Sequence, residues 1–206
     1  MTDALVTLTH AELLALALEA SRRDDSAQAL ACLKASASRA DAPALALFML
    51  GSEYAQLGLV DQAKAAFGQA VERGPDLPLA RFQLGMLHMT CGEVDTARAV
   101  WAPLALLEAS HPQAYLACFH RGMCHLAADE FAQAAQALGE GVALNQDNPP
   151  LNNDMRRVID AIQHLPNHPG MLAVPAQDPQ APQEGASAAE APAHLFISAY
   201  ANGKLH

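Results

Sequence analysis

A 34-residue period is the feature of this sequence that most limits its fold. Small residues recur at this spacing, and large apolar residues recur with them. The repeating positions are Ala29, Ala63 and Ala97; Leu33, Phe67 and Trp101; and Gly51 and Gly85. Self-similarity at a fixed period is typical of repeat architectures, in which each unit buries its apolar face against its neighbours. The period therefore predicts a stack of similar structural units.

The composition favours helices and argues against nucleic acid as a partner. Ala, Leu, Gln and Glu dominate, and only 5% of the residues are aromatic, which favours an all-α fold over a β-sandwich or barrel. Twenty-two acidic residues stand against twelve Lys and Arg, for a formal charge of −10. Because binding a polyanion requires cations that displace counterions, DNA, RNA and anionic membranes are not expected partners.

The sequence is expected to be cytoplasmic. No stretch has the roughly eighteen apolar residues that a membrane span needs, so no membrane insertion is predicted. The first residues, Met1 to Leu5, lack the positive charge that opens a secretory signal. The four cysteines form no CxxC pair, and in a reducing compartment they are expected to be small core residues.

Segment 44–77 carries the fullest version of the repeat. Its marked positions are Leu47, Leu50, Gly51, Tyr54, Ala63, Phe67 and Pro75. This pattern resembles the tetratricopeptide repeat, in which a large residue, Leu-Gly, Tyr, Ala, Phe and Pro follow at these spacings. The resemblance implies an all-α, right-handed superhelix of helix-turn-helix units. The two helices of each unit would cross closely where Gly51 and Ala63 leave no bulk.

The resemblance divides residues 1–165 into a repeat domain of about four units. The expected units are 10–43, 44–77, 78–111 and 115–148, followed by a capping helix at 151–165. Pro103 falls inside the second helix of the third unit and should kink it. Arg121 stands where the family has Leu in the fourth unit.

The C-terminal part of the chain has a different composition. Segment 166–192 is rich in Pro and Ala, with six of the thirteen prolines and no aromatic residue, Lys or Arg, and is predicted to be a flexible linker. Segment 193–206 is predicted to be an apolar tail motif. Its docking residues would be Leu195, Phe196, Ile197 and Tyr200. The tail could plug the groove, exchange between molecules, recruit a second protein, or have no role.

In this family the first helix of each unit lines a concave surface, where ligands usually lie. Apolar periodicity alone predicts a second apolar stripe on the same helices. The candidate groove residues are Leu14, Leu18, Leu45, Phe48, Leu79, Phe82, Met86, Met89, Leu116, Phe119, Met123 and Leu126. The functional interpretation is a groove for an apolar peptide or an amphipathic helix. The alternative is that this stripe is core, buried within a kinked superhelix or by dimerisation.

The expected function is that of a protein-binding adaptor or chaperone. The groove positions hold no Lys, Asn or Arg, unlike the repeat proteins that grip the carboxylate of heat-shock chaperone tails. In size and groove character the chain resembles the class II chaperones of bacterial type III secretion, and an accessory subunit of another multi-protein machine fits equally well. The alternative is a self-associating structural scaffold, with the tail docked in its own molecule or exchanged.

Catalysis and cofactors are not expected. The sequence has no phosphate loop, GxSxG, HExxH or calcium-loop pattern. A group of His and Cys residues on the third and fourth units has zinc-ligand chemistry, but packing is the expected role. Its members are His88, Cys91, Cys118, His120, Cys124 and His125. The chain is therefore predicted to be non-enzymatic, with no metal and no cofactor.

Overall fold

The computed structural model describes residues 5–164, and every regular element in that range is helical. The elements are α2 (His10–Arg22), α3 (Ser26–Ala37), α4 (Ala44–Gln56), α5 (Val60–Arg73), α6 (Pro78–Thr90), α7 (Val94–Trp101), the 3-10 turn η1 (Ala102–Leu106), α8 (Tyr115–Leu126), α9 (Phe131–Leu144) and α10 (Pro149–Gln163). The all-α prediction is confirmed. The predicted linker 166–192 and tail 193–206 lie outside the described residues.

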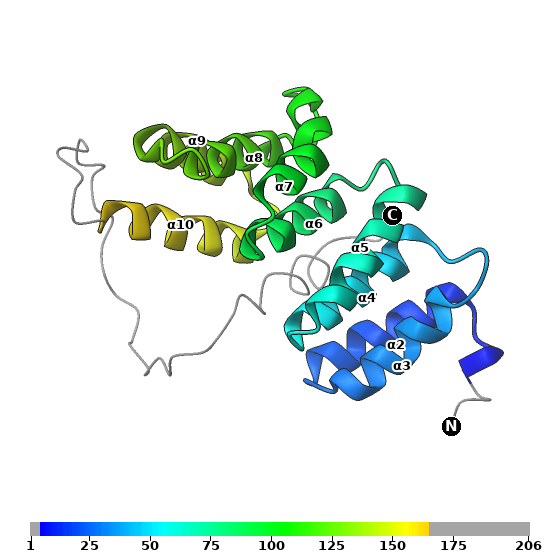
Figure 1. Ribbon diagram of the computed structural model, residues 1–206. Helices are drawn as coiled ribbons and strands as arrows, with labels where there is room; N and C mark the ends of the chain where they lie inside the picture. The colour runs from blue at the N-terminus through cyan, green and yellow to red at the C-terminus, as the bar shows by residue number, and fades with distance from the viewer. Residues whose placement is uncertain (1–4, 165–206) are drawn as a thin grey trace.

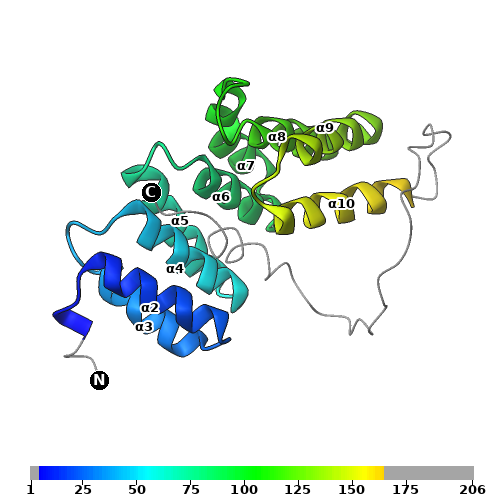
Figure 2. The ribbon, with the colours of Figure 1, turned by 180° about the vertical axis from the view of Figure 1, so that it is seen from behind.

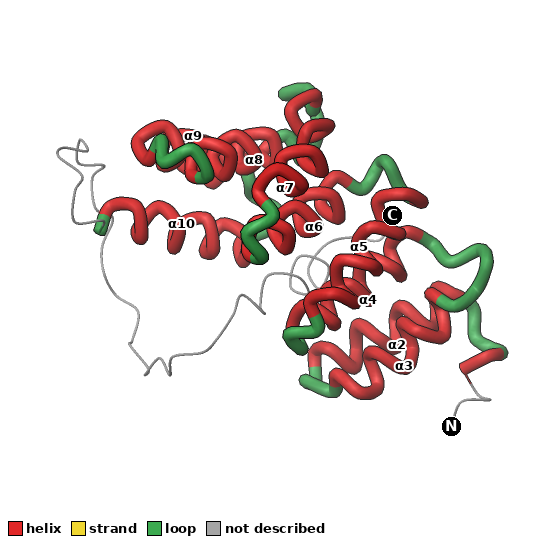
Figure 3. Tube along the Cα trace, viewed as in Figure 1, coloured by secondary structure: helices red, strands yellow, loops and turns green. Residues whose placement is uncertain are grey.

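The helices form antiparallel hairpins that stack in chain order (Figure 1). The hairpins are α2–α3, α4–α5, α6–α7 and α8–α9, and the second helix of an early hairpin packs against the first helix of the next. Hairpin α2–α3 lies at one end and α8–α10 at the other in both views (Figures 1 and 2). Short turns join most helices (Figure 3). This stack agrees with the superhelical array that the resemblance implies.

Glycine allows the two helices of a hairpin to cross closely. A Cβ atom added at Gly51 would lie 2.7 Å from the ring of Phe67. One added at Gly122 would lie 2.7 Å from the Leu138 side chain. The fourth hairpin therefore forms the same close crossing even though Arg121 replaces the family's Leu.

Pro103 shortens the second helix of the third hairpin. Helix α7 has 8 residues and ends at Trp101, whereas α5 has 14. The chain then continues as η1, in which Leu104 is buried. Proline has no N–H to donate, and its ring clashes with the preceding turn of an α-helix. The sequence predicts a kink in this helix at Pro103; instead the α-helix ends before Pro103 and a 3-10 turn follows.

Two arginines 34 residues apart lie at the C-terminal ends of the first two hairpins and bind the backbone of the segments that precede those hairpins. Arg39 donates to the backbone oxygens of Leu5 and Val6, at 3.2 Å each. Arg73 donates to the oxygens of Ala40 and Ala42, at 3.0 Å each. Arg39 lies just after α3 and Arg73 is the last residue of α5, and each binds the linker that precedes its own hairpin. The rigid fork of donors on Arg suits paired carbonyl oxygens.

Three buried asparagines shape the turn between α9 and α10. Asn145 and Asn152 exchange hydrogen bonds of 2.8 Å, in which each side-chain amide group donates to an oxygen of the other residue. The Asn148 side-chain oxygen accepts from the backbone N–H of Leu151 at 3.2 Å and caps α10. Buried polar groups need such partners. The network fixes the turn that brings α10 against α9.

Within residues 5–164, none of the helices combines the length and the apolar character that crossing a bilayer requires.

Candidate protein-binding surfaces

Half of the predicted groove residues are buried in the core. The six are Phe48, Leu79, Phe82, Leu116, Phe119 and Met123, and all belong to one continuous hydrophobic cluster. They therefore do not line an open groove in the described chain, which corrects the expectation from the sequence. For these six positions the alternative interpretation, a second stripe used as core, describes the structure.

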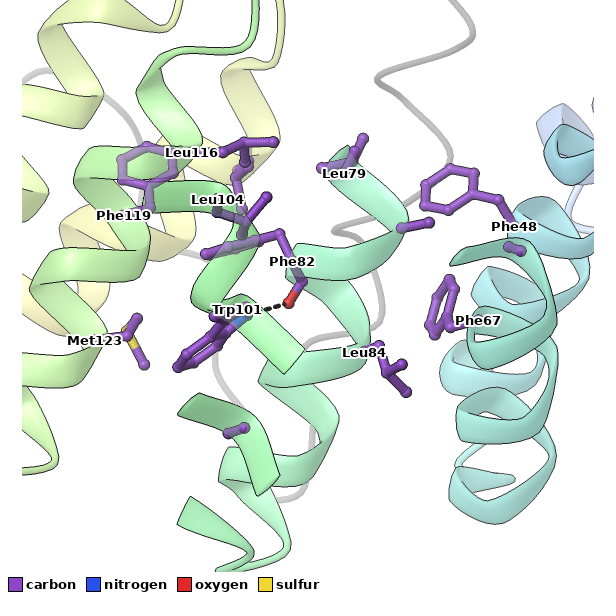
Figure 4. Close-up of a cluster of buried hydrophobic side chains, with 14 of the residues drawn as sticks. Phe48, Phe67, Leu79, Phe82, Leu84, Trp101, Leu104, Leu116, Phe119 and Met123 are labelled. Atoms are coloured by element: carbon purple, nitrogen blue, oxygen red, sulfur yellow. Dashed lines mark hydrogen bonds between the residues drawn. The ribbon is translucent and has the colours of Figure 1, made fainter. Parts of the chain in front are cut away.

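Ring contacts explain why these side chains are covered. Phe48 lies 5.6 Å from Phe67, between ring centroids. Phe82 lies 5.8 Å from Trp101 and 6.1 Å from Phe119 (Figure 4). Aromatic pairs at such distances add stability beyond the area that they bury. The inner aromatic residues thus join the first helix of a hairpin to its second helix and, at Phe82, to the next hairpin.

The other six predicted groove residues remain partly exposed. They are Leu14, Leu18, Leu45, Met86, Met89 and Leu126. We call these six side chains the inner surface. They come from α2, α4, α6 and α8, which are the first helices of the four hairpins. All six are apolar, so the inner surface has no charged side chain of its own.

A pocket that the sequence did not reveal lies between α3, α4 and α5, and we call it the outer pocket. Its volume is about 390 Å³. It is lined by Lys34, Ala37, Ser38, Leu47, Leu50, Tyr54, Gln62, Ala65, Ala66 and Gln69. Leu47 and Leu50 are buried and form an apolar floor, whereas Lys34 and Gln62 are exposed at the rim. The alanines on α3 and α5 leave the space open, and they were the available sequence signal.

A buried carboxylate joins the first two hairpins. Glu53 on α4 is 2% exposed and accepts a 2.5 Å hydrogen bond from the Ser21 hydroxyl on α2. Burial raises the pKa of Glu53 above its usual value, and the bond from Ser21 opposes this only in part. The other carboxylate oxygen has no partner among the described residues. Glu53 therefore links α4 to α2 through Ser21. Among the described residues it has no second titratable side chain as a hydrogen-bond partner.

The turns of the third and fourth hairpins each pair a histidine with a glutamate. His88 contacts Glu93, and His125 lies 2.5 Å from Glu130. Lys64 of the preceding hairpin also binds Glu93 at 2.8 Å. Lys64 and His88 hold the pKa of Glu93 below its usual value. The two histidines, expected to act only in packing, also make polar contacts. In the described part of the chain, no three His, Cys, Asp or Glu residues are grouped to hold a metal.

The comparisons with known proteins agree with this architecture. Residues 48–102 match the family model described as "Tetratricopeptide repeat". A solved structure titled "MamA RS-1 ArsTM double mutant" is similar, with 16% identity and a TM-score of 0.52, over 75% of this chain and 92% of that chain. Another, titled "MamA MSR-1 C2", has 17% identity and a TM-score of 0.49, over 74% and 84%. No curated protein matches the sequence.

The matched segment begins in α4 and ends just after α7, so it covers the two central hairpins. Their Gly51–Phe67 and Gly85–Trp101 crossings carry the repeat pattern identified in the sequence. The structural similarity to the first solved structure extends the same fold to about three quarters of the chain. Residues 48–102 are therefore tetratricopeptide repeats, and the hairpins on either side continue their fold.

Proposed function

We propose that this protein is a non-enzymatic adaptor or chaperone that holds an apolar peptide or amphipathic helix of another protein on its inner surface. The repeat fold supports a protein-interaction module. A cytoplasmic location and action without a cofactor are part of the proposal. The contact residues would be the partly exposed Leu14, Leu18, Leu45, Met86, Met89 and Leu126.

The observation that carries the proposal is the pair of partly exposed methionines on α6. Met86 and Met89 are three residues apart, so they share one side of the helix. Both rest against the main hydrophobic cluster without being buried in it. Methionine is flexible and polarisable, and it suits surfaces that adapt to different apolar partners. An amphipathic helix would complement such a surface.

A more specific role as a secretion chaperone rests on size and on the apolar character of the inner surface. The buried state of Phe48, Phe82 and Phe119 narrows the binding surface to the partly exposed side chains. The alternative function, a self-associating scaffold, depends on Leu195, Phe196, Ile197 and Tyr200. These tail residues lie outside the described residues.

The test is affinity purification of a partner, followed by binding measurements on the purified pair. The double variant Met86→Asp/Met89→Asp should lose binding, because it places two charges in the centre of an apolar contact. Its matched control is Leu106→Asp/Leu144→Asp, which adds the same charge at apolar side chains that are 83% and 59% exposed. Circular dichroism of both variants should match that of the wild type. Unchanged binding by the methionine variant would exclude the inner surface as the contact site.

A further inference from the structure

We propose that the outer pocket is the docking site for this chain's own segment 195–200, within the same molecule. This goes beyond the proposed adaptor function, because the outer pocket and the inner surface share no residue. The occupant is identified by the shape of the pocket, the charge at its rim and the length of chain that follows α10.

The lining of the outer pocket suits one or two large apolar side chains. Its floor is formed by Leu47 and Leu50 of α4, and Ala65 and Ala66 of α5 line one wall together with two glutamines. A volume of about 390 Å³ falls within the usual range for pockets that enclose a ligand. Beyond residue 164 the only aromatic residues are Phe196 and Tyr200, and they lie beside Leu195 and Ile197.

The charge at the rim also suits the segment before Leu195. Lys34 lies with its Nζ atom 5.5 Å from the centre of the Tyr54 ring. Among the residues that the structure describes, Lys34 has this ring contact and no ion-pair partner. Glu190 stands five residues before Leu195 in the sequence. A docked segment would bring that carboxylate to the rim, where Lys34 offers the only cationic side chain lining the pocket.

The chain after α10 is long enough to reach the outer pocket. Thirty residues separate residue 164 from Leu195, and a flexible chain of that length has a root-mean-square span of roughly 30 Å. Hairpins α6–α7 and α8–α9 separate the pocket from α10, and thirty residues can extend to roughly 100 Å, more than two hairpins of helices packed about 8–10 Å apart require. Attachment to the same molecule also gives the segment an effective concentration on the order of mM, which favours binding within one molecule.

The experiment places a benzophenone photo-crosslinker at position 196 of the full chain, in place of Phe196. Mass spectrometry then locates the crosslinked peptides. We expect links within residues 34–38 and 62–69 of the same molecule. Ala65→Trp should fill the outer pocket and lower this yield about tenfold, because an apolar side chain would lose its burial. Ala99→Trp is the matched control, since Ala99 is also exposed and stands 34 residues later.

Two further measurements make the outcome decisive. The same crosslinker at Ala188 should give no preferred product, and Met86→Asp/Met89→Asp should leave the yield from position 196 unchanged. Links to any other surface, links between two molecules, or equal yields from Ala65→Trp and Ala99→Trp would each overturn the proposal. Failure of partner binding alone would leave it intact, because that experiment reports on the inner surface.

Discussion

The second and third hairpins follow one repeat pattern but pack differently. In α4–α5, Gly51 faces the ring of Phe67, and α5 continues for 14 residues. In α6–α7, Gly85 faces the larger ring of Trp101, and α7 stops there. The Trp101 ring N–H also donates to the Phe82 backbone oxygen at 2.9 Å (Figure 4). The comparison teaches that the pattern fixes where helices cross, while single side chains decide which contacts each crossing makes.

The turns of the same two hairpins differ as well. Tyr54 and Leu59 of the second hairpin are replaced by His88 and Glu93 in the third, 34 residues later. Glu93 then binds Lys64 of the second hairpin. In arrays of this kind, contacts between neighbouring repeats supply much of the stability. The third hairpin is therefore tied to its neighbour by a polar contact as well as by packing.

The largest expected effect is the loss of stability when a buried aromatic ring of either hairpin, Phe48 or Phe82, is removed. Phe82→Ala should destabilise the protein by about 3–5 kcal/mol, because it leaves a cavity in a fully buried site. Phe48→Ala is the comparison, because Phe48 is equally buried and its removal should cost an amount in the same range. Chemical denaturation would measure both values. A cost of less than about 1 kcal/mol for either variant would contradict the placement of that ring in the core.

The next effect concerns the glycines at the crossings. Gly85→Ala should destabilise by about 1–3 kcal/mol or more, because the new methyl group overlaps the hydrogen-bonded Trp101 ring. Gly51→Ala should cost less, because the Phe67 ring has no such bond to break. Gly68→Ala is the control. A Cβ there meets nothing within 4 Å, so it should stabilise by about 0.5–1 kcal/mol. Thermal melts would rank the three variants. If Gly51→Ala cost more than Gly85→Ala, the idea that its hydrogen bond holds the Trp101 ring in place would be wrong.

The buried carboxylate gives the second hairpin a source of pH dependence that the third hairpin lacks at the matching position, where Leu87 stands. Burial raises the pKa of Glu53 in the folded protein above the ordinary value of 4.5 for a glutamate. The unfolded chain therefore releases this proton more easily, and the wild type should lose stability as the pH rises above 4.5. Glu53→Gln should match the wild type below pH 4.5 and exceed it at pH 7. A wild-type advantage that grows with pH would refute this assignment.

The smallest effect tests the polar contact between the hairpins. Lys64→Met should destabilise the protein only slightly, because solvent screens a pair in which the Glu93 side chain is 45% exposed. The difference should shrink in 1 M salt. The difference should also shrink as the pH falls below 4.5. Glu93 has a lowered pKa in the folded protein, so below that pH the unfolded chain binds the proton first and the stabilisation is lost. A salt-independent loss would point to packing of the Lys64 stem.

The sequence predicted the hairpins well because their signals are local and repeated. Gly51, Ala63 and Phe67 mark a crossing wherever they recur at this spacing, and Pro103 marks the end of a helix. The structure confirms the all-α fold, and at Pro103 the α-helix ends where the sequence predicts only a kink. The asparagine network at the α9–α10 turn had no such signal, since it joins residues that follow no repeat.

The surface was harder to predict than the fold. Periodicity shows which apolar side chains of α6 or α8 lie outside the stripe that packs within their own hairpin. It cannot show whether a neighbouring hairpin covers those side chains. Phe82 and Met86 belong to the same predicted groove, yet Phe82 is buried by rings from two other helices and Met86 is not. The outer pocket arises because the side chains between α3 and α5 do not fill the available space. Whether such a space stays open depends on three-dimensional packing.

The arginines that close the first two hairpins also indicate where this chain would accept an inserted domain. Arg39 and Arg73 hold the linkers before α2 and α4, so lengthening either would break bonds to the backbone. The equivalent position after α7 is Leu107, and the segment from it to α8 includes the exposed residues Ala109 and Ser110. A fluorescent protein or affinity module spliced between those two residues should leave both neighbouring hairpins folded.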